Sequence, residues 1–250
     1  MKENSIHDLY KHETSYWWHK GRRVVIDSML KRFLEPRSAL RILDVGCGTG
    51  MNLELLSKFG QVHGVDASPI AVHYCLQRGF SDVYEGRAED LKFADESFDM
   101  VVAIELLEHV QEDVDTLREF ARVLRPGGLL FLTVPAYQFL WTEHDEVLDH
   151  VRRYTLGELK KKLQEAGFRV EKGTYMVTFT SPLFVYRLFR HLFGKKNETP
   201  KTSYVPVPSF LNAIFVASFF LEATIVKYVS LPFGISVLCV ARKVENPTLR

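Results

Sequence analysis

The stretch Leu43-Asp44-Val45-Gly46-Cys47-Gly48-Thr49-Gly50 decides the fold. An apolar run over residues 40–45 leads into this loop, in which every second residue from 46 to 50 is glycine, and a helical pattern follows. Glycine permits positive φ in a tight turn and lets a ligand approach the backbone, while the loop amides and the helix N-terminus face that ligand. The stretch therefore predicts a strand–loop–helix unit that binds a small molecule.

A carboxylate follows at the distance that such a unit requires. Asp66 comes sixteen residues after Gly50 and closes a second apolar run, residues 62–65. An acid at the end of the second strand is the usual partner of a ribose diol. We therefore predict that one nucleoside-type cofactor binds between two adjacent parallel strands.

Composition limits the class of protein. A chain of 250 residues with 46% hydrophobic content suits one α/β domain with a sizeable core. The formal net charge of +1 gives no field that attracts nucleic acid, so we expect no nucleic-acid partner. The three cysteines at 47, 75 and 239 are far apart and the N-terminus does not begin like a signal peptide, which favours a cytoplasmic setting.

Apolar runs and helical patterns alternate along the chain, as in a doubly wound parallel sheet. Strands are expected near residues 40–45, 61–65, 82–85, 98–104, 128–134, 168–175 and 234–243. Helices are expected near residues 20–34, 51–59, 68–78, 112–124 and 155–166. Pro126 and the two glycines after it end the 112–124 helix, because proline cannot continue it and glycine permits the reversal.

The glycine spacing distinguishes between nucleoside cofactors. It is D-x-G-x-G-x-G rather than the dinucleotide fingerprint G-x-G-x-x-G. With Asp66 and four later stretches, the chain resembles class I S-adenosylmethionine-dependent methyltransferases of a bacterial type 11/type 12-like subgroup. The four stretches are Arg87-Ala88-Glu89-Asp90-Leu91, Ser97-Phe98-Asp99-Met100-Val101-Val102, Glu105-Leu106-Leu107-Glu108-His109-Val110 and Leu124-Arg125-Pro126-Gly127-Gly128. The resemblance implies a seven-stranded, mostly parallel Rossmann-like sheet with an antiparallel last strand.

The resemblance also implies the cofactor, S-adenosyl-L-methionine, with S-adenosyl-L-homocysteine as product. The expected cofactor-binding residues are Asp44, Gly46, Cys47, Gly48, Gly50, Asp66, Ala67, Ala88, Glu89 and Glu105. The family usually has Asp at the position of Arg87, and because arginine cannot accept the adenine amino proton, Glu89 or a backbone carbonyl takes over that contact. Glu105 either borders the methionine part of the cofactor or caps the helix after it.

Polar residues gather after the fifth strand, at residues 141–154. We expect His144 or His150 to act as general base, oriented by Asp145, while Arg152 and Arg153 pair with a substrate anion and Tyr154 joins the substrate site. The competing interpretation is a salt-bridged loop that folds over the cofactor. His144, Asp145 and His150 lack a recognisable metal-site spacing, so we expect no metal there.

His109 is a further base candidate, although this position is commonly a packing histidine in the family. Trp17 and Trp18 precede an amphipathic helix. They either close a lid over cofactor and substrate or form a hydrophobic staple at the helix entry. These features divide the chain into an N-terminal cap (1–37), a cofactor-binding core (38–175), an apolar helical insertion (176–233) and the last strand with its tail (234–250).

The insertion is far longer than the usual loop between two strands. It contains two apolar runs, residues 183–193 and 210–229, separated by a polar stretch. The runs either pack as helices over the sheet edge, form an apolar substrate chamber, or touch a membrane. Glu222 and the shortness of the second run argue against a transmembrane span, whereas basic residues beside the first run favour contact with a membrane surface.

We therefore expect an enzyme that transfers a methyl group to an oxygen, ahead of nitrogen or carbon, of a small or amphipathic, lipid-linked acceptor. Its expected location is the cytoplasm, with peripheral contact at the inner face of the membrane. One alternative is a noncatalytic cofactor-binding partner or sensor, which needs the glycine loop and Asp66 but not the polar cluster. A nicotinamide oxidoreductase is disfavoured by the glycine spacing.

Overall fold

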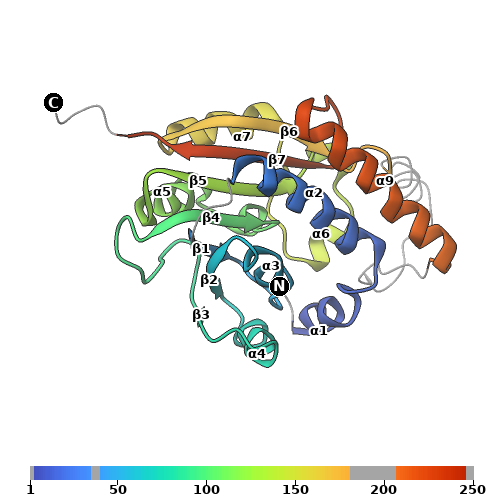
Figure 1. Ribbon diagram of the computed structural model, residues 1–250, viewed down its shortest axis with the longest axis horizontal. Helices are drawn as coiled ribbons and strands as arrows, with labels where there is room; N and C mark the ends of the chain where they lie inside the picture. Colours follow the sequence, from blue (N-terminus) through green and yellow to red (C-terminus); the bar gives the residue numbers. More distant parts are fainter. Residues whose placement is uncertain (1–2, 35–39, 181–206, 246–250) are drawn as a thin grey trace.

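A seven-stranded sheet forms the centre of the computed structural model, which describes residues 3–34, 40–180 and 207–245 (Figure 1). Its strands are β1 (Leu40–Val45), β2 (Gly60–Asp66), β3 (Val83–Glu85), β4 (Phe98–Ile104), β5 (Leu124–Pro135), β6 (Phe168–Met176) and β7 (Ser236–Lys243), in the order β3-β2-β1-β4-β5-β7-β6. The pairs from β3 to β5 are parallel, and β7 runs antiparallel between β5 and β6. The expected doubly wound sheet with an antiparallel last strand is confirmed.

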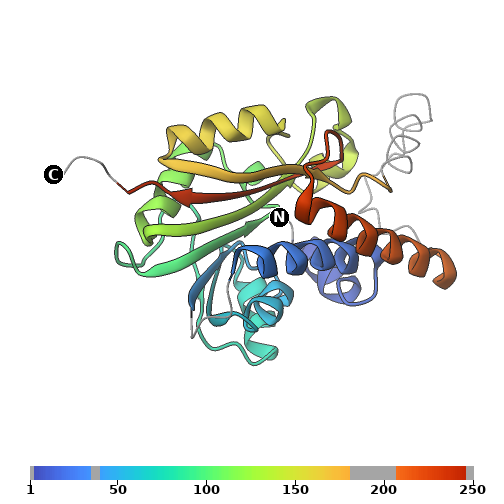
Figure 2. The same ribbon diagram turned by 45° about the horizontal axis from the view of Figure 1, so that its top comes forward.

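Helices cover both faces of the sheet (Figure 2). One face packs against α5 (Asp113–Val123) and α7 (Leu156–Glu165), and the other packs against α2 (Trp17–Phe33), α3 (Met51–Leu56) and α9 (Ser209–Tyr228). The helix α4 (Pro69–Gln77) lies beside β2 and β3. Because both faces are covered, the central strands are continuous apolar runs, and neighbours such as Val101 and Val102 enter different cores.

Several expected boundaries move, and short helices appear that we did not predict. The helix expected from residue 20 begins at Trp17, and the strand expected from residue 128 begins at Leu124, which already pairs with Phe98 across a bulge. The unpredicted elements are α1 (Glu3–His12), α6 (Glu143–Val147) and the 3₁₀ turns η1 (Leu107–His109) and η2 (Gln138–Leu140).

The second apolar run of the insertion forms α9, which packs along α2. Gly21 allows the close approach, since a Cβ there would lie 2.1 Å from Cδ2 of Phe219. Glu222, in the middle of α9, is buried and accepts hydrogen bonds from the amides of Val177 and Thr178. By length and composition alone α9 could cross a membrane. The first apolar run, 183–193, lies outside the described residues.

Candidate active site

The glycine loop adopts the backbone conformation that its sequence predicts. Gly46, Gly48 and Gly50 all have positive φ, at 72°, 55° and 89°. The amides of Gly46 and Cys47 both donate to the carbonyl of Val65, which joins the loop to β2. The loop is therefore held open above the carboxyl ends of β1 and β2, and its remaining backbone faces a cavity.

Two carboxylates support this loop in different ways. Asp66 accepts hydrogen bonds from the amides of Gly48 and Ser68, each at 2.9 Å, while burial raises the pKa of Asp66. Asp44 is wholly buried beneath the loop, where neither carboxylate oxygen has a hydrogen-bond partner among the described residues. Burial, and then the charge of Asp66, raise the pKa of Asp44 well above its usual range. Asp66 thus lines the cavity, whereas Asp44 supports the loop from below.

The cavity has a volume of about 490 Å³ and lies at the carboxyl ends of the strands, where open α/β sheets bind ligands. Most of the predicted cofactor residues line it, namely Gly46, Cys47, Gly48, Asp66, Ala67, Ala88, Glu89 and Glu105. Arg87 forms an ion pair with Glu89 at 2.9 Å. The cavity therefore unites the glycine loop, the end of β2 and the end of β4 in one site.

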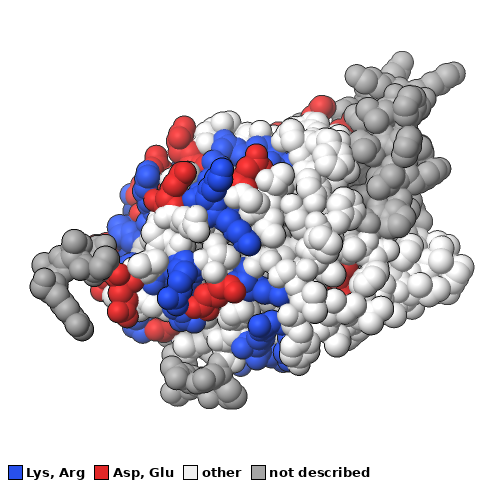
Figure 3. Space-filling model, turned by 90° about the horizontal axis from the view of Figure 1, so that it is seen from above, with Lys and Arg blue, Asp and Glu red and all other residues white. Residues whose placement is uncertain are grey.

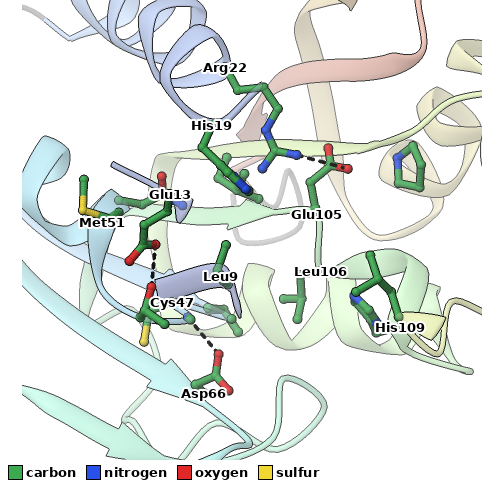
Figure 4. Close-up of a pocket in the computed structure, with 18 of the residues that line it drawn as sticks. Leu9, Glu13, His19, Arg22, Cys47, Met51, Asp66, Glu105, Leu106 and His109 are labelled. Atoms are coloured by element: carbon green, nitrogen blue, oxygen red, sulfur yellow. Dashed lines mark hydrogen bonds and ion pairs between the residues drawn. The ribbon is translucent and has the colours of Figure 1, made fainter. Parts of the chain in front are cut away.

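The N-terminal helices form a second wall, which sequence reasoning largely missed (Figure 4). Leu9 and Glu13 approach the glycine loop, and His19 and Arg22 project from α2. Glu13 is buried and binds the hydroxyl of Thr49 and the guanidinium of Arg78, each at 2.5 Å. Amphipathic spacing signalled α2, but no motif signalled which of its polar residues face the cavity.

The tandem tryptophans do not share one role. Trp17 is buried against Phe215 and Phe219 of α9, with ring centroids 5.0 and 6.1 Å apart. Trp18 lies under the guanidinium of Arg22 at 5.5 Å. Both tryptophans also line the cavity. They therefore join the N-terminal wall to α9 and to the cavity at the same time.

Glu105 sits at the end of β4 in a left-handed conformation, with φ at 51°. Its amide donates to the carbonyl of Thr133, and its carboxylate accepts from the Thr133 hydroxyl at 3.0 Å and pairs with Arg22 at 3.4 Å. This conformation costs a non-glycine residue roughly 1 kcal/mol, and such strain concentrates at functional sites. Glu105 therefore lines the cavity with Arg22 and Thr133 as its partners, and its contact with the methionine part of the cofactor stays a prediction.

The far end of the cavity is lined by His109, His144 and His150. Asp145 accepts from Nδ1 of His150 at 2.9 Å and forms two hydrogen bonds with Arg153, at 2.8 and 2.9 Å. Burial acts to raise the pKa of Asp145, but these hydrogen bonds hold it well below its usual range. Asp145 therefore fixes the orientation of the His150 ring, and the role of His150 as general base stays a prediction.

Two residues predicted to bind substrate do not line the cavity. Arg152 binds Asp113 at 2.8 Å and the carbonyl of Gln111. The buried hydroxyl of Tyr154 donates to Asp113 at 2.9 Å and to the carbonyl of Leu107. Both side chains hold the loop after α6 to the start of α5, so the prediction that they contact substrate is wrong. Arg153 does line the cavity, but its guanidinium is committed to Asp145 rather than to a free anion site.

Comparison with known proteins identifies this architecture. Residues 43–132 match the model of a methyltransferase domain. The chain is 32% identical over 162 residues to the ubiquinone biosynthesis O-methyltransferase of Parvibaculum lavamentivorans, covering 57% of this chain and 64% of that protein. Residues 43–132 therefore form a methyltransferase domain, and the chain is similar to S-adenosylmethionine-dependent methyltransferases. A family member from Mycobacterium tuberculosis, named as a probable S-adenosylmethionine-dependent methyltransferase, is 31% identical over 66% of this chain and 60% of its own length.

Solved structures share the methyltransferase fold at lower identity. A chain in the complex of the Haloferax volcanii Trm112 methyltransferase activator with a methyltransferase superposes with a TM-score of 0.62 and 20% identity, over 98% of this chain and 95% of that one. The phosphoethanolamine N-methyltransferase 2 of Haemonchus contortus, solved with S-adenosyl-L-methionine, superposes with a TM-score of 0.58 and 20% identity, over 87% of this chain and 52% of that one. These likenesses show the fold. The chain spans less than two thirds of the curated relatives' length.

The residues present fit the family's cofactor, S-adenosyl-L-methionine. A Cβ placed on Gly48 would meet only Leu9, at 3.7 Å, so the loop backbone is open to a ligand on that side. The cavity volume lies in the range of small-molecule sites. Asp66 and Glu105 place carboxylates along the wall, which suits a ligand that carries ribose hydroxyls, an ammonium group and a positive sulfonium.

Proposed function

We propose that this protein transfers a methyl group from S-adenosyl-L-methionine to a hydroxyl oxygen of a small, amphipathic acceptor. One observation carries the proposal: a single cavity joins the glycine loop and Asp66 to a histidine-rich end where Asp145 orients His150. The relatives named ubiquinone biosynthesis O-methyltransferase support an oxygen acceptor. When bound, the cofactor supplies a methyl group activated by its positive sulfur.

The chain's own residues then have three tasks. The glycine loop and Asp66 position the cofactor, and the walls formed by α1 and α2 keep water from the cavity, so that alignment of the reactants lowers the barrier. A histidine at the far end accepts the proton that a hydroxyl must lose to become a nucleophile. A neutral imidazole suits this task near pH 7 because it can take up a proton. Its modest basicity favours a phenolic hydroxyl, whose proton is lost more readily than that of an aliphatic alcohol.

The apolar surface of α9 supports an amphipathic acceptor taken from a lipid surface. Its outward side chains include Phe210, Ile214, Phe220 and Leu221, each more than half exposed. Viewed from above, the end of the molecule that α9 forms shows almost no charged side chains, whereas charges cover the opposite end (Figure 3). Because Glu222 is turned inward, the outward face offers no carboxylate to the lipid. We propose that α9 lies on the membrane rather than crossing it.

Sedimentation with vesicles tests this contact. The full chain should sediment with phosphatidylglycerol vesicles, and a Phe210→Ser, Phe220→Ser double variant should bind at least ten-fold more weakly. A matched control replaces Phe139, which is exposed outside α9, with Ser. If the double variant sediments like the control, or if the wild type instead dimerises through α9 without binding vesicles, the membrane contact is refuted.

Calorimetry tests the cofactor site. Wild-type protein should bind S-adenosyl-L-homocysteine, and Asp66→Ala should weaken binding by ten-fold or more because a charged hydrogen-bond acceptor is worth ~1.5–3 kcal/mol. Asp90→Ala, an exposed carboxylate outside the cavity, is the control. Binding of NAD alone would refute the assignment.

Transfer of a labelled methyl group to phenols and catechols, with and without an alkyl tail, tests the activity. We expect product with the tailed acceptors, and a strong loss of rate in His150→Gln. Cofactor binding without transfer to any acceptor of the panel would favour a noncatalytic module.

A further inference from the structure

Three side chains with metal-binding atoms meet at the histidine end of the cavity. They are Glu108 and His109 of η1 and His150 from the loop after α6. One ligand atom of each lies within 4.8 Å of the others, and Nε2 of His150 lies 4.0 Å from Oε1 of Glu108. The amide of Val151 donates to the Glu108 carbonyl at 2.8 Å, which holds the two segments in register. The cluster is thus fixed by the backbone.

Glu108 is the unexplained member of this cluster. Its side chain is 0% exposed, and neither carboxylate oxygen has a hydrogen-bond partner among the described residues. A buried carboxylate is strongly unfavourable unless it is paired or binds a metal. The nearest positive side chains, Arg22 and Arg153, are already paired with Glu105 and Asp145. Glu108 therefore lacks a positive partner.

The two imidazole rings are arranged to bind a cation beside Glu108. Nδ1 of His150 is held by Asp145, so the ring presents Nε2 to Glu108. A carboxylate that holds the outer nitrogen of a histidine is the usual second partner at metal sites, because it fixes the ring and raises the basicity of the other nitrogen. The rings of His109 and His150 meet edge to face, with centroids 4.7 Å apart. Both histidines line the cavity, so an ion between them would be reached from it.

We propose that Glu108, His109 and His150 bind one divalent first-row transition metal ion. Two imidazole nitrogens and one carboxylate oxygen suit such an ion better than Ca²⁺, which prefers oxygen ligands. Metal–ligand bonds of about 2.0–2.2 Å at tetrahedral angles put two ligand atoms of one ion about 3.4 Å apart. The ligand atoms must therefore approach one another by up to about 1.4 Å through rotation of the side chains when the ion binds. The remaining coordination positions face the cavity.

The role of the ion rests on the proposed methyl transfer, whereas its binding does not. An ion at this place lowers the pKa of an acceptor hydroxyl beside it. The O–H bond then breaks, the proton passes to His144 or to water, and the electron pair left on the oxygen forms the new bond to the methyl carbon. The bond between that carbon and the sulfur breaks in the same step, and its electron pair stays on the sulfur, which leaves S-adenosyl-L-homocysteine. His150 is thus a ligand, and His144 is the remaining base. The sequence prediction grouped His144, Asp145 and His150, but in the structure Asp145 orients the ligand His150 from behind.

Calorimetry with MnCl₂, ZnCl₂ and MgCl₂ tests the site on the full chain after removal of metal with EDTA. We expect one Mn²⁺ or Zn²⁺ per chain, with binding at least ten-fold weaker in Glu108→Gln and in His150→Gln. His144→Gln changes a histidine of the same cavity outside the cluster, and it should bind the ion like the wild type. Thermal melts should show that Glu108→Gln is at least as stable as the metal-free wild type, because a buried charge is removed.

The outcomes separate the two proposals. A wild type that binds S-adenosyl-L-homocysteine but no metal ion up to about 1 mM overturns the metal site and leaves the proposed function standing. Equal metal binding by the wild type and Glu108→Gln also overturns the metal site. Binding of Mg²⁺ that Glu108→Gln and His150→Gln both retain overturns it as well. If the metal binds with the expected pattern but S-adenosyl-L-homocysteine does not bind, the result supports the metal site and overturns the proposed function.

Discussion

His19 should make the folded protein sensitive to mild acid. The side chain lies in the cavity wall on α2, where burial, and then the charges of Arg22 and Arg23, lower its pKa to about 3 from 6.5. The unfolded chain takes up a proton near pH 6.5, whereas the folded chain keeps His19 neutral to a much lower pH. Stability from this residue is therefore intact above pH 6.5 and is lost as the pH falls from 6.5 toward 3.

The size of the effect follows from the two pKa values. At pH 5 the unfolded histidine is almost fully protonated and the folded one is not. The free energy of unfolding is therefore about 2 kcal/mol lower at pH 5 than at pH 8. The side chain is only half-buried in the wall, so solvent screening reduces this, and we expect about 1–2 kcal/mol. The variant His19→Gln cannot be protonated and should lose that much less stability between pH 8 and pH 5.

Urea unfolding followed by tryptophan fluorescence at pH 8 and pH 5 measures the difference. His73→Gln, an exposed histidine on α4, is the control and should lose as much stability as the wild type. If His19→Gln also loses as much as the wild type, His19 is not a source of the acid sensitivity and the reasoning is refuted. His109, whose pKa burial lowers to about 4, adds an effect of the same sign in all three proteins.

Three substitutions test the contacts that hold the cavity walls. Gly21→Ala should destabilise the fold by ~1–3 kcal/mol through a clash with Phe219, and added Phe219→Leu should restore part of the melting temperature; an unchanged melting temperature refutes the tight crossing. Glu222→Gln should lower the free energy of unfolding in urea by ~1–3 kcal/mol, because Gln keeps only one of the two side-chain oxygens that accept hydrogen bonds from backbone amides; an unchanged free energy of unfolding would contradict this. Asp145→Asn should lower the free energy of unfolding by ~3 kcal/mol. It should also weaken metal binding ten-fold or more, because the ring of His150 is no longer held; unaltered metal binding would contradict the orienting role of Asp145.

The sequence predicted the sheet well because buried parallel strands are continuous apolar runs. The bounds of β1 and β4 agree with the predicted ranges, and the antiparallel last strand followed from family resemblance. The helix α1 was missed because only three of its ten residues, Ile6, Leu9 and Tyr10, are apolar. The helix α9 was expected as an apolar run, but the sequence could not show which face it buries, and the inward turn of Glu222 decides that.

The candidate site was predictable where backbone spacing sets the chemistry. The glycine loop and Asp66 lie at strand ends, so their meeting follows from topology. Side-chain direction did not follow in the same way. Arg152 and Arg153 are neighbours in sequence, yet the first binds Asp113 behind the site and the second binds Asp145 at the cavity. Spacing predicts which residues come near, whereas packing decides the partner of each charge.

The metal proposal depends on Glu108, because this carboxylate lacks the ion pair that other carboxylates around the cavity have. Each of four other carboxylates near the cavity or its supporting loops meets a positive side chain: Glu13 with Arg78, Glu105 with Arg22, Asp113 with Arg152 and Lys162, and Asp145 with Arg153. Glu108 is fully buried, as Asp145 is, but no ion pair shorter than 4.0 Å joins it to a described side chain. Asp44 is also fully buried without a hydrogen-bond partner among the described residues, but Glu108 is the one that lies beside two histidines. Glu108 is therefore placed to bind a cation that arrives from the cavity.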